Sequence, residues 1–364
     1  MSINFKEQKL RILVTGGAGF IGSHLVKNLL DNNNIEIFNL DKLSYASNII
    51  QLEKINKKRN HHFIRADLSK LNQVEDAFLI AKPNIIFHLA AESHVDRSID
   101  NAKPFIESNI IGTYNLLEVA KNYWLNLGKE NKKNFRFLHI STDEVFGTLG
   151  IKGSFSEKTA YDPRSPYSAS KAASDHLTSA WFHTYGLPII RTNCSNNFGP
   201  FQFPEKLLPL IILKALNNKT IPVYGDGKNI RDWLFVEDHV EALILAACKG
   251  EVGSTYCIGG NNEKTNIEIV GLICKLLDEK IPRNNSYTDL IRFVDDRPGH
   301  DRRYAINSNF IKKELHWFPK YSFKDALNIT VDWYLKNQSW CANISNQNIY
   351  NGERIGLFEN NLIT

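Results

Sequence analysis

Two carboxylates stand side by side at Asp143 and Glu144, directly after an apolar run that is typical of a buried strand. Adjacent acids at a strand end can act as a proton donor and a proton acceptor, provided that their surroundings push their pKa values apart. The alternative is a solvated turn in which both acids interact only with water. The hydroxyl of Thr142 immediately precedes them, and this placement favours the catalytic interpretation.

A second pair, Tyr167 and Lys171, lies four residues apart in the segment SPYSASKAASDHL. On a helix this spacing places both side chains on one face. A free tyrosine ionises only in alkaline solution, so we expect the ammonium of Lys171 to lower the pKa of Tyr167 and make it a base for a hydroxyl group. The alternative is an amphipathic helix with a surface lysine, because this spacing is common by itself.

The segment TGGAGFIGSHL carries Gly16, Gly19 and Gly22 between a predicted strand and an amphipathic helix. Glycines allow the backbone to approach a pyrophosphate, and the helix N-terminus supplies N–H donors. Asp41 ends the next predicted strand, where an acid binds ribose hydroxyls and repels a 2′-phosphate. These features predict NAD in preference to NADP, although glycines also form ordinary turns and Asp41 alone could cap a helix.

Two further segments lie where predicted strands end. Asp67 follows the third strand and is a candidate partner of the adenine, while the segment from Leu89 to Ser93 follows the fourth. Ligands bind at the carboxyl ends of the strands in such sheets. The small side chains of Ala90 and Ala91 would let a dinucleotide lie close to the backbone.

Short apolar runs rich in β-branched residues alternate along the chain with segments of helical length. Near-continuous apolar strands separated in this way indicate a parallel sheet that is covered on both faces. We therefore predict an α/β fold, a Rossmann-type doubly wound parallel sheet with a smaller C-terminal α/β substrate-binding domain. Strands are expected at residues 11–15, 35–41, 62–67, 84–91, 135–142 and 187–193.

The pattern changes after Pro200, where proline, glycine and charged residues become more frequent and strands are short, as at 221–225. We predict an NAD-binding Rossmann domain with the catalytic residues at 1–200 and a smaller substrate domain at 201–340, with some segments crossing back. Residues 341–364 are polar and irregular and are expected to form a C-terminal tail.

The chain has 364 residues, a hydrophobic fraction of 43% and a net charge of +5. These values allow a large core, and the modest charge gives no reason to expect nucleic acid as a partner. Five widely spaced cysteines without a C-x-x-C motif predict free thiols and no metal site. The first residues lack an apolar signal core and no apolar run could span a bilayer, so we expect a cytoplasmic protein with no membrane partner.

In combination, the glycine motif and the Tyr167–Lys171 pair resemble the extended short-chain dehydrogenase/reductase family, over nearly the whole chain. In that family a serine or threonine at the end of the fifth strand joins the tyrosine and lysine, and Thr142 matches it. Further stretches are similar to the dTDP-glucose 4,6-dehydratases, namely HLAAESHVDRSI, STDEVFG, PYSASKAASDHL, TNCSNNFGP, FPEKLLPL, IRDWLFVEDH and DRPGHDRRYAI.

This resemblance implies a hydro-lyase that converts dTDP-glucose to dTDP-4-keto-6-deoxyglucose in deoxysugar biosynthesis, with dTDP-rhamnose as the expected end product. It implies that Thr142 holds the C4 oxygen, that Asp143 is the acid toward O6, and that Glu144 is the base at C5. Tyr167 and Lys171 complete the implied catalytic set.

The resemblance also implies two binding sites and no metal. The NAD site comprises Gly16, Gly19, Phe20, Ile21, Gly22, Asp41, Lys42, Ser44, Asp67, Leu68, Leu89, Ala90, Ala91, Ser108, Tyr167, Lys171 and Asn197. The sugar-nucleotide site comprises Ser93, Thr142, Asn196, Lys206, Leu207, Pro222, Tyr224, Arg231, Asn266, Arg297 and His300. The two arginines lie in loop-like sequence and suit a diphosphate, although either one alone could form a surface ion pair.

Other functions remain open at this point. A UDP-sugar epimerase or a UDP-glucuronate decarboxylase of the same family would leave the Asp143–Glu144 pair idle, and a non-catalytic NAD-sensing regulator would have lost part of the catalytic set. The hypothesis of a nucleic-acid-binding protein is supported only by the mild positive charge. A homodimer is expected from the resemblance, and the apolar helical segments Phe105–Leu117 and Tyr167–Tyr185 would suit its interface.

Overall fold

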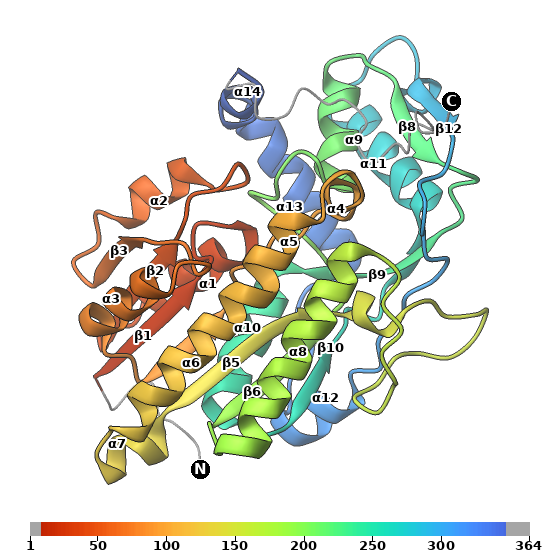
Figure 1. Cartoon of the computed structure of the whole chain (residues 1–364). Helices are drawn as coiled ribbons and strands as arrows, with labels where there is room; N and C mark the ends of the chain where they lie inside the picture. The colour runs from red at the N-terminus through yellow and green to blue at the C-terminus, as the bar shows by residue number, and fades with distance from the viewer. Residues whose placement is uncertain (1–8, 347–364) are drawn as a thin grey trace, which may run out of the picture.

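The computed structural model describes residues 9–346, and its main body is a seven-stranded sheet between two layers of helices (Figure 1). The strands lie in the order β10-β6-β5-β4-β1-β2-β3, and each neighbouring pair is parallel. This confirms the Rossmann-type sheet that the sequence predicts. The strands are β1 Leu10–Thr15, β2 Ile35–Asp41, β3 His61–Arg65, β4 Ile85–His88, β5 Arg136–Thr142, β6 Ile189–Cys194 and β10 Thr255–Ile258.

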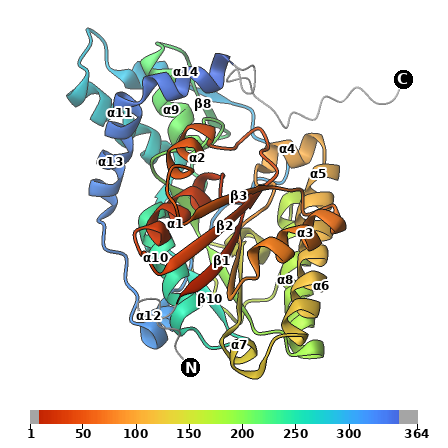
Figure 2. The ribbon, with the colours of Figure 1, turned by 90° about the vertical axis from the view of Figure 1, so that its left-hand side faces the viewer.

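Helices cover both faces of the sheet, as Figure 2 shows edge-on. Because neither face meets water, strand residues are buried whatever their type, and all seven residues of β5 are buried, including the polar Arg136 and His139. One face packs against α3 Leu71–Ala81, α6 Gly112–Leu125 and α8 Pro166–Tyr185. The other packs against α1 Phe20–Leu30, α10 Val236–Lys249 and α12 Asn309–Leu315.

Shorter elements connect the strands of this body. They are α2 Ile49–Ile55, α4 Val95–Asp100, α5 Lys103–Phe105, the π-helical η1 Ile106–Ile111, α7 Lys129–Asn134 and the 3₁₀ turn η2 Asp143–Phe146. Two strands are shorter than expected, since β3 ends at Arg65 and β4 at His88. After His88 the chain passes against the glycine loop, where a Cβ on Gly16 would lie 2.7 Å from the Ala90 Cα.

A second region with its own apolar core packs at the carboxyl edge of the sheet. It contains a three-stranded sheet in the order β11-β9-β7 and a parallel pair of β12 and β8. Its elements are β7 Asn196–Phe198, α9 Leu207–Leu216, β8 Ile221–Tyr224, β9 Ile230–Phe235, β11 Glu263–Thr265, α11 Asn266–Lys280, η3 Tyr287–Leu290, β12 Ile291–Val294, α13 Phe323–Lys336 and α14 Gln338–Asn346.

The chain crosses between the two regions more than once. Helices α10 and α12 and strand β10 follow residue 200 in the sequence but belong to the seven-stranded body. The domain boundaries at residues 200 and 340 therefore stay a prediction. The same prediction allowed some segments to cross back between the domains. The predicted tail begins within α14, and residues 347–364 lie outside the described residues.

Within residues 9–346 no helix combines the length and the apolar character needed to cross a membrane. All five cysteines fall in this range, and no disulfide joins any of them.

Candidate active site

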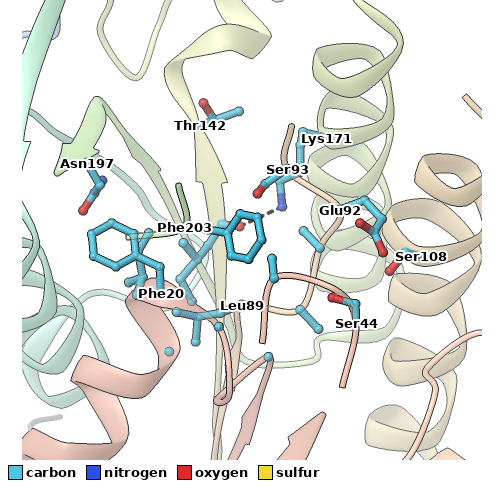
Figure 3. A pocket seen from close by; sticks show the side chains of 18 of the residues that line it. Phe20, Ser44, Leu89, Glu92, Ser93, Ser108, Thr142, Lys171, Asn197 and Phe203 are labelled. Atoms are coloured by element: carbon cyan, nitrogen blue, oxygen red, sulfur yellow. Dashed lines mark hydrogen bonds between the residues drawn. The ribbon is translucent and has the colours of Figure 1, made fainter. Parts of the chain in front are cut away.

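A cavity of about 280 Å³ opens where β1, β2, β4, β5 and β6 end, between the sheet and residues 194–206. All the residues predicted for the NAD site line it, and so do Thr142, Asp143 and Glu144. Figure 3 shows Thr142 at the end of its strand and Lys171 reaching inward from its helix. Topology therefore brings together segments that lie up to 190 residues apart, Gly16 and Lys206 being the two ends.

The glycine loop is shaped by contacts that exclude side chains. Gly16 has a φ of +74°, which favours glycine, and its N–H donates to the Leu40 carbonyl at 2.8 Å. A Cβ on Gly22 would lie 2.1 Å from the Gly16 carbonyl oxygen, so the first turn of α1 can approach the loop only without one. The loop therefore presents the N-terminus of α1 directly to the cavity.

Asp41 lies at the end of β2 and fixes the loops around it. Its Oδ2 accepts the Ala18 N–H at 3.1 Å and its Oδ1 accepts the Leu43 N–H at 2.8 Å. Burial raises the pKa of Asp41, and these two N–H donors oppose the rise. Each carboxylate oxygen can accept more than one hydrogen bond, so acceptor sites remain for ribose hydroxyls. The glycine cradle and this acid together fit a dinucleotide.

Tyr167 and Lys171 lie on the same face of α8, as their spacing predicts, and both line the cavity. The expected lowering of the tyrosine pKa is wrong for the protein groups alone. Burial raises the pKa of Tyr167 well above its ordinary value, and the nearby Glu144 raises it further. Lys171 is itself buried, which lowers its pKa, and its Nζ donates to the Ile140 carbonyl at 2.8 Å.

Asp143 and Glu144 stand in different electrostatic surroundings. Asp143 is 1% exposed, and burial raises its pKa well above the ordinary value, with Glu144 and Asp232 adding to the rise. Burial also raises the pKa of Glu144, but Arg297, Lys206 and Arg231 act against it. The environment therefore favours a protonated Asp143 and, relative to it, an ionised Glu144.

A buried acid behind the site fixes the end of β5. Asp175, one helical turn beyond Lys171, accepts His139 Nε2 at 2.9 Å and Ser141 Oγ at 2.8 Å. It also accepts the Tyr161 hydroxyl at 2.8 Å. Sequence reasoning did not assign this residue, although its spacing of four from Lys171 was a usable signal.

The residues predicted for the substrate divide into two groups. Ser93, Asn196 and Lys206 line the cavity with the catalytic residues, and Lys206 Nζ donates to the Ser93 carbonyl at 2.7 Å. The others lie outside its lining, in the second region: Leu207, Pro222, Tyr224, Arg231, Asn266, Arg297 and His300.

Two members of that outer group, Arg231 and Arg297, nevertheless act electrostatically on Glu144, which lines the cavity. Arg297 pairs with Asp96 at 3.3 Å, and the hydroxyl of Tyr224 donates to the same carboxylate at 3.3 Å. The loop-like placement of Arg231 is wrong, because it belongs to β9, which is hydrogen-bonded to β11 and β7. Its guanidinium is buried, donates to the Ile230 and Asp301 carbonyls, and lies 4.2 Å from the Tyr304 ring centroid.

A family model described as GDP-mannose 4,6 dehydratase matches residues 13–330. A dTDP-glucose 4,6-dehydratase of Salmonella typhimurium is 52% identical over 344 residues, which cover 92% of this chain and 95% of that protein. The chain belongs to the dTDP-glucose 4,6-dehydratase family.

Two further members of the dTDP-glucose 4,6-dehydratase family support this placement. The protein of Neisseria meningitidis serogroup B is 52% identical over 351 residues, covering 95% of this chain and 99% of its own. The crystal structure of the Bacillus anthracis enzyme in complex with NAD matches with a TM-score of 0.82 and 42% identity, over 92% of this chain and 99% of that one.

One more residue that sequence reasoning missed lines the cavity of this family member. Glu205 accepts the Tyr45 hydroxyl and the Arg97 Nε, each at 2.8 Å, and the Arg97 guanidinium lies 3.9 Å from the Tyr45 ring centroid. The carboxylate thus ties the β2–α2 loop and α4 to the second region. Its position next to Lys206 in the sequence was the signal from which a place at the cavity could have been predicted.

Proposed function

We propose that this protein is a dTDP-glucose 4,6-dehydratase that uses NAD and works in deoxysugar biosynthesis. The observation that carries the proposal is the pair Asp143 and Glu144, set beside Tyr167 at one end of the cavity and given unlike electrostatic surroundings. The family placement and the names of the relatives support the substrate.

The cofactor would lie along the glycine loop, with its ribose at Asp41 and its adenine near Asp67. The NAD complex of the Bacillus anthracis relative supports this cofactor. Bound NAD would supply the acceptor for the hydride of C4, a positive charge beside Tyr167, and the hydride that C6 later receives. The small side chains of Ala90 and Ala91 leave room beside the loop.

Oxidation at C4 requires a base for the hydroxyl proton. Tyr167 takes that proton, Thr142 holds the C4 oxygen, and Lys171 supplies the local positive charge. Because burial and Glu144 oppose ionisation of Tyr167, the positive charge of bound NAD would favour loss of the Tyr167 proton.

Elimination requires an acid and a base acting together. A ketone at C4 makes the C5 proton acidic, and Glu144 removes it, which requires an ionised carboxylate. Asp143 donates its proton to the C6 hydroxyl, which departs as water, so this carboxyl has to be protonated beforehand. Burial, Glu144 and Asp232 outweigh Arg231 and Thr142 at Asp143 and favour its protonated form, whereas three cations oppose the rise in the pKa of Glu144.

The nucleotide diphosphate would lie toward the second region. Lys206 and Asn196 line the cavity there, and Arg231 and Arg297 add positive charge near Glu144. Leu207, Pro222, Tyr224, Asn266 and His300 would enclose the base and ribose. These assignments rest on the family resemblance and on the charge that Arg231 and Arg297 exert on Glu144.

Same-family alternatives are disfavoured by the two acids. An epimerase removes hydride from C4 and returns it to the same carbon, and needs neither an acid at O6 nor a base at C5. A regulator without catalysis would not need Thr142, Tyr167 and Lys171 together, and all three line the cavity.

We propose a homodimer formed through the helices that Figure 1 shows side by side, α6 and α8. Ile106, Ile111, Tyr114 and Tyr185 are each more than 40% exposed on these helices and the adjoining η1. Apolar side chains gathered on one face suit a subunit interface. Five thiols without a disulfide suit the cytoplasm as its location.

The test is the product formed from dTDP-glucose by the purified protein in heavy water. A dehydratase yields the 4-keto-6-deoxy sugar with deuterium at C5. Formation of dTDP-galactose without loss of water would replace this proposal with an epimerase, and the absence of any turnover by NAD-loaded protein would favour the regulator.

A further inference from the structure

The C-terminal helix α14 reaches the cofactor side of the molecule through one buried tryptophan. The indole Nε1–H of Trp340 donates to Asn48 Oδ1 at 3.1 Å, across 292 positions of sequence. Trp340 is 6% exposed and Asn48 is 4% exposed. Figure 2 shows α14 above α2, the helix that begins directly after Asn48.

Asn48 in turn holds the glycine loop. Its backbone N–H donates to the Ala18 carbonyl at 2.7 Å, and its Oδ1 also accepts the Gln51 N–H at 3.2 Å as the N-cap of α2. The N–H of Ala18 donates to Asp41. An unbroken series of hydrogen bonds therefore runs from α14 through Asn48 and the glycine loop to the acid at the end of β2.

The tryptophan is fixed on its other side by the second region. Its ring lies 6.0 Å from that of Phe201 and 5.1 Å from that of Trp333, measured between centroids. The hydroxyl of Tyr334 donates to the carbonyl of Gln202, which lines the cavity. Helices α13 and α14 thus hold residues 201–202 and Asn48 at the same time.

We propose that Trp340 is a positioning residue for the cofactor, which it retains by holding Asn48 and hence the glycine loop. The inference rests on the proposed use of NAD. Cofactor release requires the loops between β1 and α1 and between β2 and α2 to loosen, and the Trp340–Asn48 bond stabilises the closed arrangement. An enzyme that returns its own hydride benefits from slow cofactor release.

The test compares Trp340→Phe with Trp317→Phe in the full chain. Trp317 is a matched control, because it is 2% exposed and its indole also donates one bond, at 3.2 Å to the Asp238 carbonyl, yet it does not line the cavity. The NAD retained on the protein is followed by absorbance at intervals after rapid desalting. We expect Trp340→Phe to release NAD roughly 3- to 10-fold faster than wild type, as loss of one hydrogen bond implies.

Hydrogen exchange and kinetics provide the second reading. The Asn48 amide should exchange faster in Trp340→Phe than in wild type, and the apparent KM for added NAD should rise by more than kcat falls. In Trp317→Phe both should match wild type. Equal release of NAD from the two variants and wild type would overturn the proposal, whereas a wild-type protein that binds no NAD would overturn the proposed function instead.

Discussion

The two sides of the cavity bind by different physical means. On the cofactor side, the glycine loop (residues 16–22) and Ala90 offer backbone groups and space, and their contacts are steric. On the substrate side, Glu144 lines the cavity, Arg231 and Arg297 lie beyond its lining, and their interactions with Glu144 are electrostatic. Shape therefore governs the first side, and charge balance governs the second.

This difference determines what each side can tolerate. A steric site fails when an atom is added, irrespective of pH, because packed backbone cannot move aside without strain. An electrostatic site fails when one charge is removed, because the remaining buried charges change their pKa values. Substitutions on the two sides of the cavity therefore separate these two responses.

The largest expected effect is the loss of either catalytic acid. We predict that Asp143→Asn and Glu144→Gln each lower dehydration by a factor of about 10² to 10⁴, because one proton transfer in the elimination is lost. Oxidation at C4 uses neither acid, so the absorbance of reduced nicotinamide should still appear on mixing with dTDP-glucose. Stopped-flow absorbance and product analysis measure the two steps separately.

Heavy water distinguishes the two variants from each other. Asp143→Asn keeps the base and should still exchange the C5 proton, whereas Glu144→Gln should not. Tyr167→Phe should fail earlier and give little reduced nicotinamide. Near wild-type dehydration by both carboxylate variants would show that the acids are structural and would favour an epimerase.

The next largest effect is steric. We predict that Gly22→Ala loses NAD and about 1–3 kcal/mol of stability, because its Cβ would lie 2.1 Å from the Gly16 carbonyl oxygen. Gly271→Ala is the matched control: it is also a helical glycine, but a Cβ there meets no atom within 4 Å. It should gain up to about 1 kcal/mol. Thermal unfolding and NAD retention report the outcome, and equal behaviour of the two would refute the steric account.

A smaller effect is expected from the substrate side. We predict that Arg231→Ala raises the KM for dTDP-glucose roughly tenfold and lowers kcat less, because a diphosphate contact acts alike on ground and transition states. Since its guanidinium also holds the Asp301 carbonyl, the Tm should fall too.

Arg303→Ala is the control for the stability part of that change. Arg303 is comparably buried and likewise donates to backbone carbonyls, those of Gly150 and Gly153. It should lose Tm with little change in KM. A fall in kcat with unchanged KM in Arg231→Ala would place that arginine at the reacting carbons instead.

The smallest effect is a displacement of the pH profile. Glu144 has to be ionised, so kcat/KM should fall as pH drops through its pKa, which burial raises and Arg297 lowers. Removing that cation in Arg297→Ala should raise the pKa and move the acid limb to higher pH. The exposed Arg292→Ala should leave the limb in place. A limb that stays fixed in both variants would show that another group controls it.

Much of the cofactor site could be predicted because its signals are local. Gly16 and Gly22 are only six residues apart, and Tyr167 and Lys171 are about one helical turn apart, so their relation follows from backbone geometry. The acids after β5 are likewise adjacent in sequence. All these residues line the same cavity, and the parallel sheet is the one expected.

Only the tertiary structure decided the pKa values and the contacts that depend on segments far apart in the sequence. The pKa of Tyr167 rises, against expectation, because the side chain is buried and Glu144 lies nearby. Arg231 proved to lie in a strand, and Trp340 contacts Asn48 from the far end of the chain. Spacing along a chain fixes which side chains share a face. Burial and the sum of nearby charges depend instead on which remote segments fold together. Burial and charge in turn set the protonation state of each acid and base.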